Sequence, residues 1–175
     1  MKSLHPARAI PSVCIGTRAP TCFGPPFQER DRLGDDLVPD YLTHLEQGAF
    51  YGWPYTYIGT HPDPRIKEQR ADLRAKTKVP DALLGSHVAV LDFAFYTGRQ
   101  FPREYQGGAF LAFHGSWNRS KRVRYEVAFL PFRNGEPAGE LQDFVTGWMP
   151  APDKAQVWGR PVAVPDAGWQ SARHR

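Results

Sequence analysis

Short apolar or alternating runs, separated by turn residues, fill residues 29–164 of the chain. Alternation with a period of two, or a brief apolar run between turns, is typical of β-strands. The pattern predicts strands at residues 50–59, 87–96, 108–114, 124–132 and 143–149. We therefore expect an all-β fold. Strands of this length and spacing suit a sandwich or a propeller, and periodicity alone does not distinguish the two.

Two local features refine this pattern. Residues 108–114 and 124–132 are predicted to pair antiparallel, and Asn134-Gly135 after them is a strong hairpin-turn signal. A helix is possible at residues 66–76, the most charged stretch. The interpretation we favour there is a solvated connector between blades, since a charge run alone does not make a buried element.

The two ends of the chain differ from the middle. Residues 1–28 show neither a period of 2 nor of 3.6, and prolines interrupt every candidate element. Residues 165–175 are also predicted to be irregular. We expect three parts: an irregular start (1–28), the β-rich part (29–164) and an irregular tail (165–175).

Composition narrows the function classes. The chain has 175 residues, of which 41% are hydrophobic and 13% aromatic, and this argues against disorder. The net charge of +4 is small and the basic residues are mixed with acids, so nucleic-acid binding has little support. No apolar run approaches the roughly 20 residues of a membrane span, and the start MKSLHP lacks the apolar stretch of a secretory signal. Only Cys14 and Cys22 are present, which predicts neither a zinc site nor a disulfide framework.

The densest polar cluster is residues 29–36, with the sequence ERDRLGDD. Carboxylates and backbone carbonyls in such a loop could hold a hard cation, because calcium accepts many oxygen ligands in loose geometry. The alternative, which we favour on the residues alone, is a charged turn with internal Arg–Asp pairs.

A second polar cluster, HGSWNRSKR, follows an apolar strand at residues 114–122. Ser116 lacks the glycine two positions later that a nucleophile elbow needs. Arg119, Lys121 and Arg122 could pair with an anionic ligand or form a solvated loop tip. Residues 118–120 also fit a glycosylation acceptor, a pattern that is common by chance.

A third cluster is WGRP at residues 158–161, where a single arginine is weak evidence. Among the six histidines, His87 and His114 adjoin predicted strands and are the two candidates for a site. A structural role is the leading interpretation for both.

Five segments in order carry a family resemblance: 29–59 (ERDRLGDDLVPDYL to GAFYGWPYTYIG), 94–98 (AFYTG), 113–120 (FHGSWNRS), 131–139 (PFRNGEPAG) and 157–164 (VWGRPVAV). Together they resemble the L-sorbosone dehydrogenase branch of the soluble glucose/sorbosone dehydrogenases. Those enzymes use pyrroloquinoline quinone and are six-bladed β-propellers. The resemblance implies a propeller fragment of about two to three blades over residues 29–164.

The resemblance also implies a calcium site. The family's loop gives backbone carbonyls to the calcium that holds the quinone, and these positions match Asp31 and Arg32. Asp36 matches the acidic residue that follows and supports the site. Leu37 stands where many members have glutamate.

Further positions match the quinone and substrate contacts. Asn118 takes the place of a cofactor-contacting lysine, Arg160 matches the second of two cofactor arginines, and Trp158 replaces the first. An arginine fork suits the carboxylates of the quinone. The segment that ends at His87 falls near the substrate mouth.

The implied reaction is oxidation of an aldose or a sorbosone-type carbonyl or hemiacetal, with a histidine as general base and hydride transfer to the quinone. An external acceptor takes the electrons. The base histidine and an R-N-P motif match nothing in residues 29–164, so no catalytic residue is expected here and the chain is expected to be inactive. Intact members are periplasmic. The alternative is a non-catalytic propeller-like binding module, which the departures at Leu37, Asn118 and Trp158 favour.

The irregular ends suggest a hypothesis that rests on the genetic code. If the last base of each codon is read with the first two bases of the next codon, from Arg8 onward, the permitted codons can encode R-N-P-V-G-L, which contains the family's R-N-P motif. A frame shift in the opposite direction from Gly168 permits D-G-S-L-L-V, which resembles a blade strand. Both ends are then frameshifted translations of a longer dehydrogenase gene, in which Cys14 and Cys22 carry no function.

Overall fold

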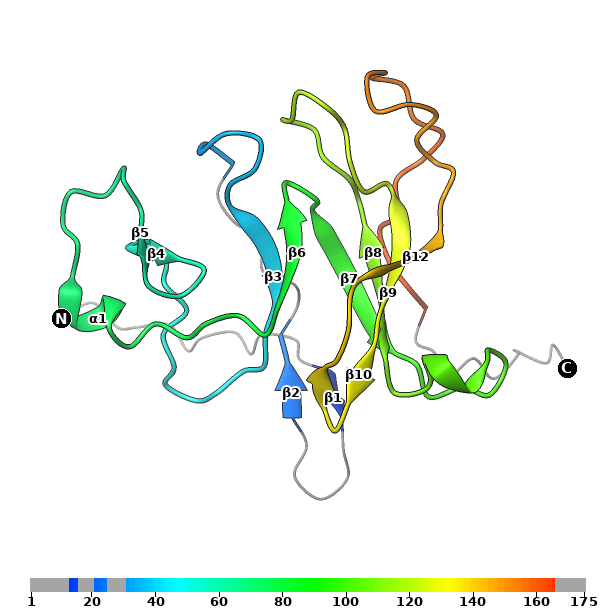
Figure 1. The fold of residues 1–175 in the computed structure, drawn as a ribbon, viewed down its shortest axis with the longest axis horizontal. Coiled ribbons are helices and arrows are strands. Elements are labelled where there is room, and N and C mark those ends of the chain that lie inside the picture. The colour runs from blue at the N-terminus through cyan, green and yellow to red at the C-terminus, as the bar shows by residue number, and fades with distance from the viewer. Residues whose placement is uncertain (1–12, 16–20, 25–30, 166–175) are drawn as a thin grey trace, which may run out of the picture.

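The computed structural model describes residues 13–15, 21–24 and 31–165. Its largest unit is a four-stranded antiparallel sheet in the order β12-β9-β8-β7 (Figure 1). The strands are β7 (Val90–Phe95), β8 (Ala109–Phe113), β9 (Glu126–Leu130) and β12 (Gln142–Val145). All five residues of β8 are buried, so the sheet has apolar side chains on both faces. The all-β class is confirmed.

The sheet confirms four of the five predicted strands, each shorter than predicted, and the predicted pairing of β8 with β9. The Asn134-Gly135 turn is also confirmed. It joins β10 (Phe132–Arg133) to β11 (Glu136–Pro137), and its two residues have φ of 55° and 84°. Positive φ at both central positions is what a type I′ hairpin requires.

The predicted aromatic strand at residues 50–59 is wrong over most of its length. Only β4 (Thr56–Tyr57) forms, paired with β5 (His61–Pro62). The chain turns earlier because the backbone N–H groups of Tyr55 and Thr56 both donate to the Gly52 carbonyl at 2.8 Å, and Gly52 has φ of 104°. The charged stretch 66–76 contains one short helix, α1 (Ala71–Arg74), with no buried residue. It is solvated, as in the interpretation we favoured.

A second antiparallel ribbon pairs β3 (Pro39–Leu42) with β6 (Ala82–Ser86), and neither strand was predicted. Leu42 and Leu84 of this ribbon pack against the face of the sheet that carries Leu111 and Phe113, which we call the first face. Residues 43–81 form the excursion between the two strands, which contains β4, β5 and α1. The ribbon thus covers one side of the four-stranded sheet.

Two short strands lie in the part of the chain predicted to be irregular. β1 (Val13–Ile15) and β2 (Thr21–Phe23) pair antiparallel, with Cys14 directly opposite Cys22. Cys22 is disulfide-bonded, which corrects the expectation that the cysteines form no disulfide framework. Residues 1–12, 16–20, 25–30 and 166–175, which include most of the two frameshift candidates, lie outside the described residues.

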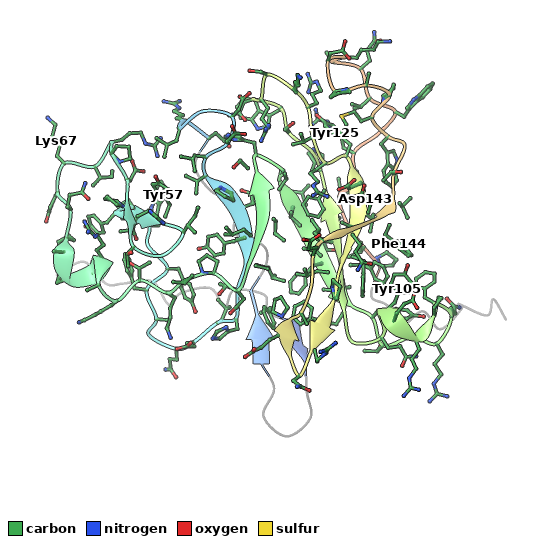
Figure 2. All side chains as sticks on the ribbon, in the orientation of Figure 1. Tyr57, Lys67, Tyr105, Tyr125, Asp143 and Phe144 are labelled. Atoms are coloured by element: carbon green, nitrogen blue, oxygen red, sulfur yellow. The ribbon has the colours of Figure 1, made fainter. Side chains whose placement is uncertain are left out.

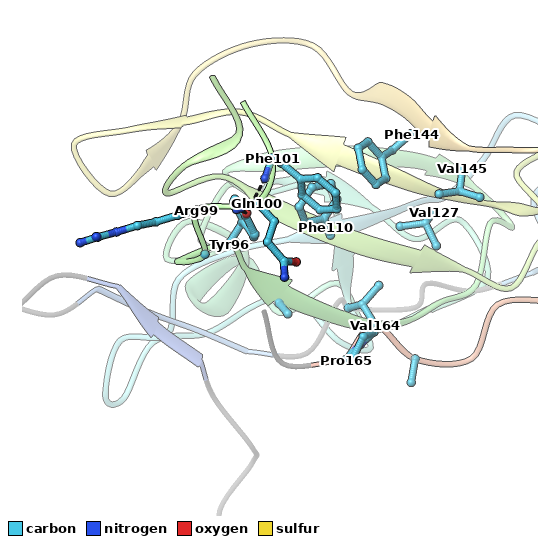
Figure 3. Close-up of a pocket in the computed structure, with 13 residues that line it drawn as sticks. Tyr96, Arg99, Gln100, Phe101, Phe110, Val127, Phe144, Val145, Val164 and Pro165 are labelled. Atoms are coloured by element: carbon cyan, nitrogen blue, oxygen red, sulfur yellow. Dashed lines mark hydrogen bonds between the residues drawn. The ribbon is translucent and has the colours of Figure 1, made fainter. Parts of the chain in front are cut away.

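The second face of the sheet carries a separate aromatic cluster of Tyr96, Phe110 and Phe129. Tyr105 lies beside it, with its ring centroid 5.4 Å from that of Phe144 (Figure 2). A cavity of about 470 Å³ opens on this face (Figure 3). Its lining includes Phe110, Val127, Phe144, Val145 and Val164. In the described part of the chain, no helix is long and apolar enough to cross a membrane.

Candidate functional site

The polar clusters singled out from the sequence lie at one end of the sheet, uppermost in Figure 1. They belong to the loop before β3, the turn between β6 and β7, the loop between β8 and β9, and the segment after β12. We call this set of loops the strand-end cluster. Strand ends are where rigid β-scaffolds place variable loops that carry function.

Two of the predicted site residues, Asp31 and Asn118, are in contact in the strand-end cluster. Asn118 donates from Nδ2 to the backbone carbonyl of Asp31 at 3.0 Å, across 87 sequence positions. The next residue, Arg119, donates from Nη2 to Oδ1 of Asp36 at 3.1 Å and from Nη1 to the carbonyl of Ser86 at 3.4 Å. Residues 118 and 119 thus bring their loop into contact with Asp31 and Asp36, and the roles expected for Asp31, Asp36 and Asn118 stay predictions.

The following residue extends the same contact. The backbone N–H of Ser120 donates to both carboxylate oxygens of Asp35, at 3.2 and 3.1 Å. Hydrogen bonds from Ser120 lower the pKa of Asp35 below its ordinary value. Residues 118–120 thus hold the acidic loop 31–36 through three successive contacts.

His87 is buried beneath the acidic loop, with 5% of the residue exposed. Its Nδ1 lies 3.0 Å from Oδ1 of Asp31, and its Nε2 lies 2.7 Å from the carbonyl oxygen of Gly34. Burial lowers the pKa of His87, but the Gly34 carbonyl and the Asp31 carboxylate outweigh it, so the pKa is raised. Asp40 stabilises the β6–β7 turn, because its carboxylate accepts the Ala89 N–H at 2.8 Å. His87 therefore braces the acidic loop from the β6–β7 turn, and both ring nitrogens are engaged.

Arg160 and Trp158 lie in the segment after β12. The Arg160 guanidinium stacks over the ring of Tyr125, with its carbon 5.0 Å from the ring centroid. Tyr125 is buried and its hydroxyl also accepts from Nη1 of Arg122 at 3.1 Å. Trp158 is 83% exposed. Arg160 is thus fixed on an aromatic face, whereas the Trp158 indole projects into solvent.

Ser116 and His114 have structural roles. Ser116 is fully buried, and its hydroxyl accepts the Val123 N–H at 2.9 Å. Its backbone carbonyl accepts the hydroxyl of Tyr125. His114 donates from Nδ1 to the Pro161 carbonyl at 3.1 Å, which ties the Arg160 segment to the end of β8. The exclusion of Ser116 as a nucleophile agrees with this burial.

Two polar atoms of the strand-end cluster remain without partners. Asn118 Oδ1 and Arg119 Nε are both buried and have no hydrogen-bond partner within the described part of the chain. Buried polar groups are normally satisfied, so these atoms fit a site that receives a polar ligand. Arg119 Nε is a donor and, with the Arg160 guanidinium of the same cluster, suits an anionic ligand with carboxylates, such as pyrroloquinoline quinone, whereas Asn118 Oδ1 can only accept a hydrogen bond.

The expected calcium ligands fit less well. Calcium takes six to eight oxygen ligands, yet the described residues contain no group of three or more His, Cys, Asp or Glu that could hold a metal. The Asp36 carboxylate faces the Arg119 guanidinium, and the Asp31 carbonyl accepts from Asn118. The carboxylate support expected from Asp36 therefore does not fit a calcium site. Coordination by the carbonyls of Asp31 and Arg32 stays a prediction.

Sequence reasoning missed the residues that join the loops. Asp35, Ser86 and Ser120 each contact another loop of the cluster, and none of these contacts was predicted. Arg119 was considered for an external anion, but its partner is Asp36. The available signal was the acid pair Asp35-Asp36 and the cation Arg119, because opposite charges in two strand-end loops favour contact.

Comparison with known proteins places this geometry in a family. The sequence model described as TrAA12-like matches residues 58–160, more than half of the chain. The chain belongs to the TrAA12-like family. An uncharacterized protein of Borreliella burgdorferi is 34% identical over 137 residues, which are 77% of this chain and 35% of that protein.

Two solved structures resemble the TrAA12-like chain in fold. A calcium structure of Trichoderma reesei Carbohydrate-Active Enzymes Family AA12 is 19% identical with a TM-score of 0.56, over 78% of this chain and 40% of that one. The holo form of the pyranose dehydrogenase PQQ domain from Coprinopsis cinerea is 17% identical with a TM-score of 0.57, over 82% and 44%. The chain spans less than half the length of these relatives. Its fold is part of a β-propeller of this kind.

Proposed function

We propose that this chain is part of a pyrroloquinoline quinone-dependent dehydrogenase of the glucose/sorbosone type. The substrate class is an aldose or a sorbosone-type carbonyl or hemiacetal. The observation that carries the proposal is the meeting of Asp31, His87 and Asn118 at one end of the sheet. The sequence resemblance assigns these positions to cofactor, metal and substrate contacts.

The chain's own residues would bind and orient the quinone. Arg160 is held over Tyr125 and supplies a fixed guanidinium for a carboxylate. Asn118 offers its unpartnered Oδ1, and the exposed Trp158 indole offers a flat face for an aromatic ring. The quinone, when bound, supplies a two-electron acceptor for hydride from the substrate carbon.

The proton of the substrate hydroxyl needs a base. His87 is a poor candidate because both of its ring nitrogens already face oxygen atoms of residues 31 and 34. Its role at the substrate mouth is proposed to be support of the acidic loop. We propose that the base belongs to another part of the family's propeller, to which no segment of residues 29–164 corresponds.

A turnover assay tests this proposal. The purified chain is mixed with pyrroloquinoline quinone, calcium and a panel of aldoses, and dye reduction is measured. We expect quinone binding without dye reduction. Turnover above the protein-free blank would contradict the assignment of the base to another part of the propeller.

A pair of arginine variants locates the quinone. Arg160→Met should weaken quinone binding about tenfold, the loss of one charge-assisted contact. Arg133→Met is the matched control, since Arg133 is an exposed residue of β10 at the other end of the sheet (Figure 1). Equal affinities for the two variants, measured by equilibrium dialysis, would overturn the placement at Arg160.

A further inference from the structure

The acidic loop 31–36 already has protein partners for its charges. The Asp31 carboxylate contacts His87 at 3.0 Å, the Asp35 carboxylate accepts the Ser120 N–H, and the Asp36 carboxylate contacts Arg119 at 3.1 Å. A loop that waits for a metal ion has its carboxylates turned toward one empty centre. These three carboxylates are directed at three different protein groups instead.

Arg119 is the central cation in this arrangement. Its side chain is 18% exposed, and its guanidinium bridges the Asp36 carboxylate and the Ser86 carbonyl. Ser86 in turn donates from Oγ to the backbone carbonyl of Asp36 at 2.7 Å. The Asp36 side chain, which is 91% exposed, therefore contacts Arg119, and the Asp36 backbone is held by Ser86.

We propose that Arg119 is a positioning residue that takes the place of a bound cation. It neutralises and holds the acidic loop, so that the loop keeps its conformation without calcium. Calcium at Asp36 would have to displace the guanidinium or lie beside it, and two cations in contact with one carboxylate repel each other. This inference concerns the loop in the absence of quinone and does not depend on the proposed dehydrogenase reaction.

Arg119 differs in its contacts from Lys121 and Arg122, the other basic residues of the same loop. Arg122 donates to Ser116 and Tyr125, on the other side of the loop. Lys121 is exposed. Lys121→Met therefore removes a positive charge from the same loop without removing the contact to Asp36, and it is the matched control for Arg119→Met.

The experiment compares thermal midpoints in a calcium chelator and in millimolar calcium, without quinone. The wild-type chain and Lys121→Met should have the same midpoint in both solutions. Arg119→Met should melt about 4 °C lower in chelator, and calcium should restore at least half of that shift, because the Asp36 carboxylate has then lost its guanidinium and can accept the metal. Arg119→Lys keeps the charge and should show no calcium dependence.

A purely structural role for Arg119 would lower the midpoint equally in both solutions, and that result overturns the proposal. Stabilisation of the wild-type chain by calcium would also overturn it. If Arg119→Met does not fold, tryptic cleavage after Arg32 in the wild-type chain decides. We expect equal cleavage rates with and without calcium, and at least tenfold protection by calcium would contradict the inference.

Discussion

The two faces of the four-stranded sheet are both apolar, but they are covered differently. The first face packs against the β3–β6 ribbon, with Phe23 and Phe132 set edge to face around Phe95. The second face is covered by Tyr105, by residues around Phe101 and by the segment ending at Pro165. The cavity of about 470 Å³ lies on the second face.

The difference lies in how completely each face is buried within the chain. The first face is a finished sheet-on-sheet contact, in which Leu111 and Phe113 have no solvent exposure. The second face keeps Phe101 39% exposed and Val145 42% exposed. In a propeller, neighbouring blades pack their sheets face to face. The second face has the composition of such an interface and, in the part of the chain that the structure describes, is covered by the short 3-10 helix Arg103–Tyr105 and by loop segments.

The largest effect is expected from truncation on the first face. Phe113→Ala should lower the free energy of unfolding by about 3–5 kcal/mol, because it removes a fully buried ring and leaves a cavity. Phe144→Ala, on the cavity side, should cost about 1–2 kcal/mol, because its ring is only partly buried. Urea denaturation of both variants measures the difference. Equal losses would show that the second face is packed as well as the first.

A smaller effect, on self-association, is expected from the second face. Apolar patches of this kind and exposed edge strands such as β12 favour association. Val145→Lys should reduce concentration-dependent association in sedimentation velocity, since Val145 lines the cavity. Val162→Lys is the control, at an exposed valine outside the cavity lining. A wild-type chain that stays monomeric at all concentrations would remove the basis of this prediction.

The smallest effect is a pH dependence at the rim of the first face. His44 lies with Nδ1 2.8 Å from Asp81 and Nε2 2.8 Å from Glu46, and its ring is edge-on to Phe23. The Asp81 hydrogen bond is the main cause that raises the pKa of His44, and Glu46 adds to it against burial. Glu46 is also paired with Lys78 at 2.7 Å.

A folded-state pKa above the ordinary value means that His44 adds stability below about pH 6.5, and this contribution is lost as pH rises through the raised pKa. His44→Gln should therefore lower the melting temperature in acid and converge with the wild type in alkali. His61→Gln, which changes a ring stacked on Tyr57, is the control. A His44→Gln deficit that is constant with pH would contradict this interpretation.

The sheet could be predicted from the sequence because its signals are local. Residues 108–114 and 124–132 alternate or run apolar between glycine turns, and they became β8 and β9. The ribbon of β3 and β6 could not be predicted. Its partners are about 40 positions apart, and its residues include Asp40 and Gly85, which are unfavourable in strands. Pairing with a distant segment and burial against the sheet decided the conformation of both strands.

The candidate site, too, could be predicted only in part from the sequence. The clusters 29–36 and 114–122 could be marked as polar segments at strand ends, and the family resemblance supplied their roles. The contacts of Asn118 with Asp31 and of Arg119 with Asp36 span 87 and 83 positions. Local patterns carry no information on such contacts. The raised pKa of His87 likewise depends on Gly34, a carbonyl that no motif marks.

Quinone binding at the strand-end cluster is tested most directly by amide chemical shifts. Pyrroloquinoline quinone is titrated into the isotopically labelled wild-type chain. We expect the largest shifts at His87, Asn118 and Arg160 in the strand-end cluster. Shifts confined to Val127, Phe144 and Val164 around the cavity of the second face, or no shifts at saturating quinone, would contradict this prediction.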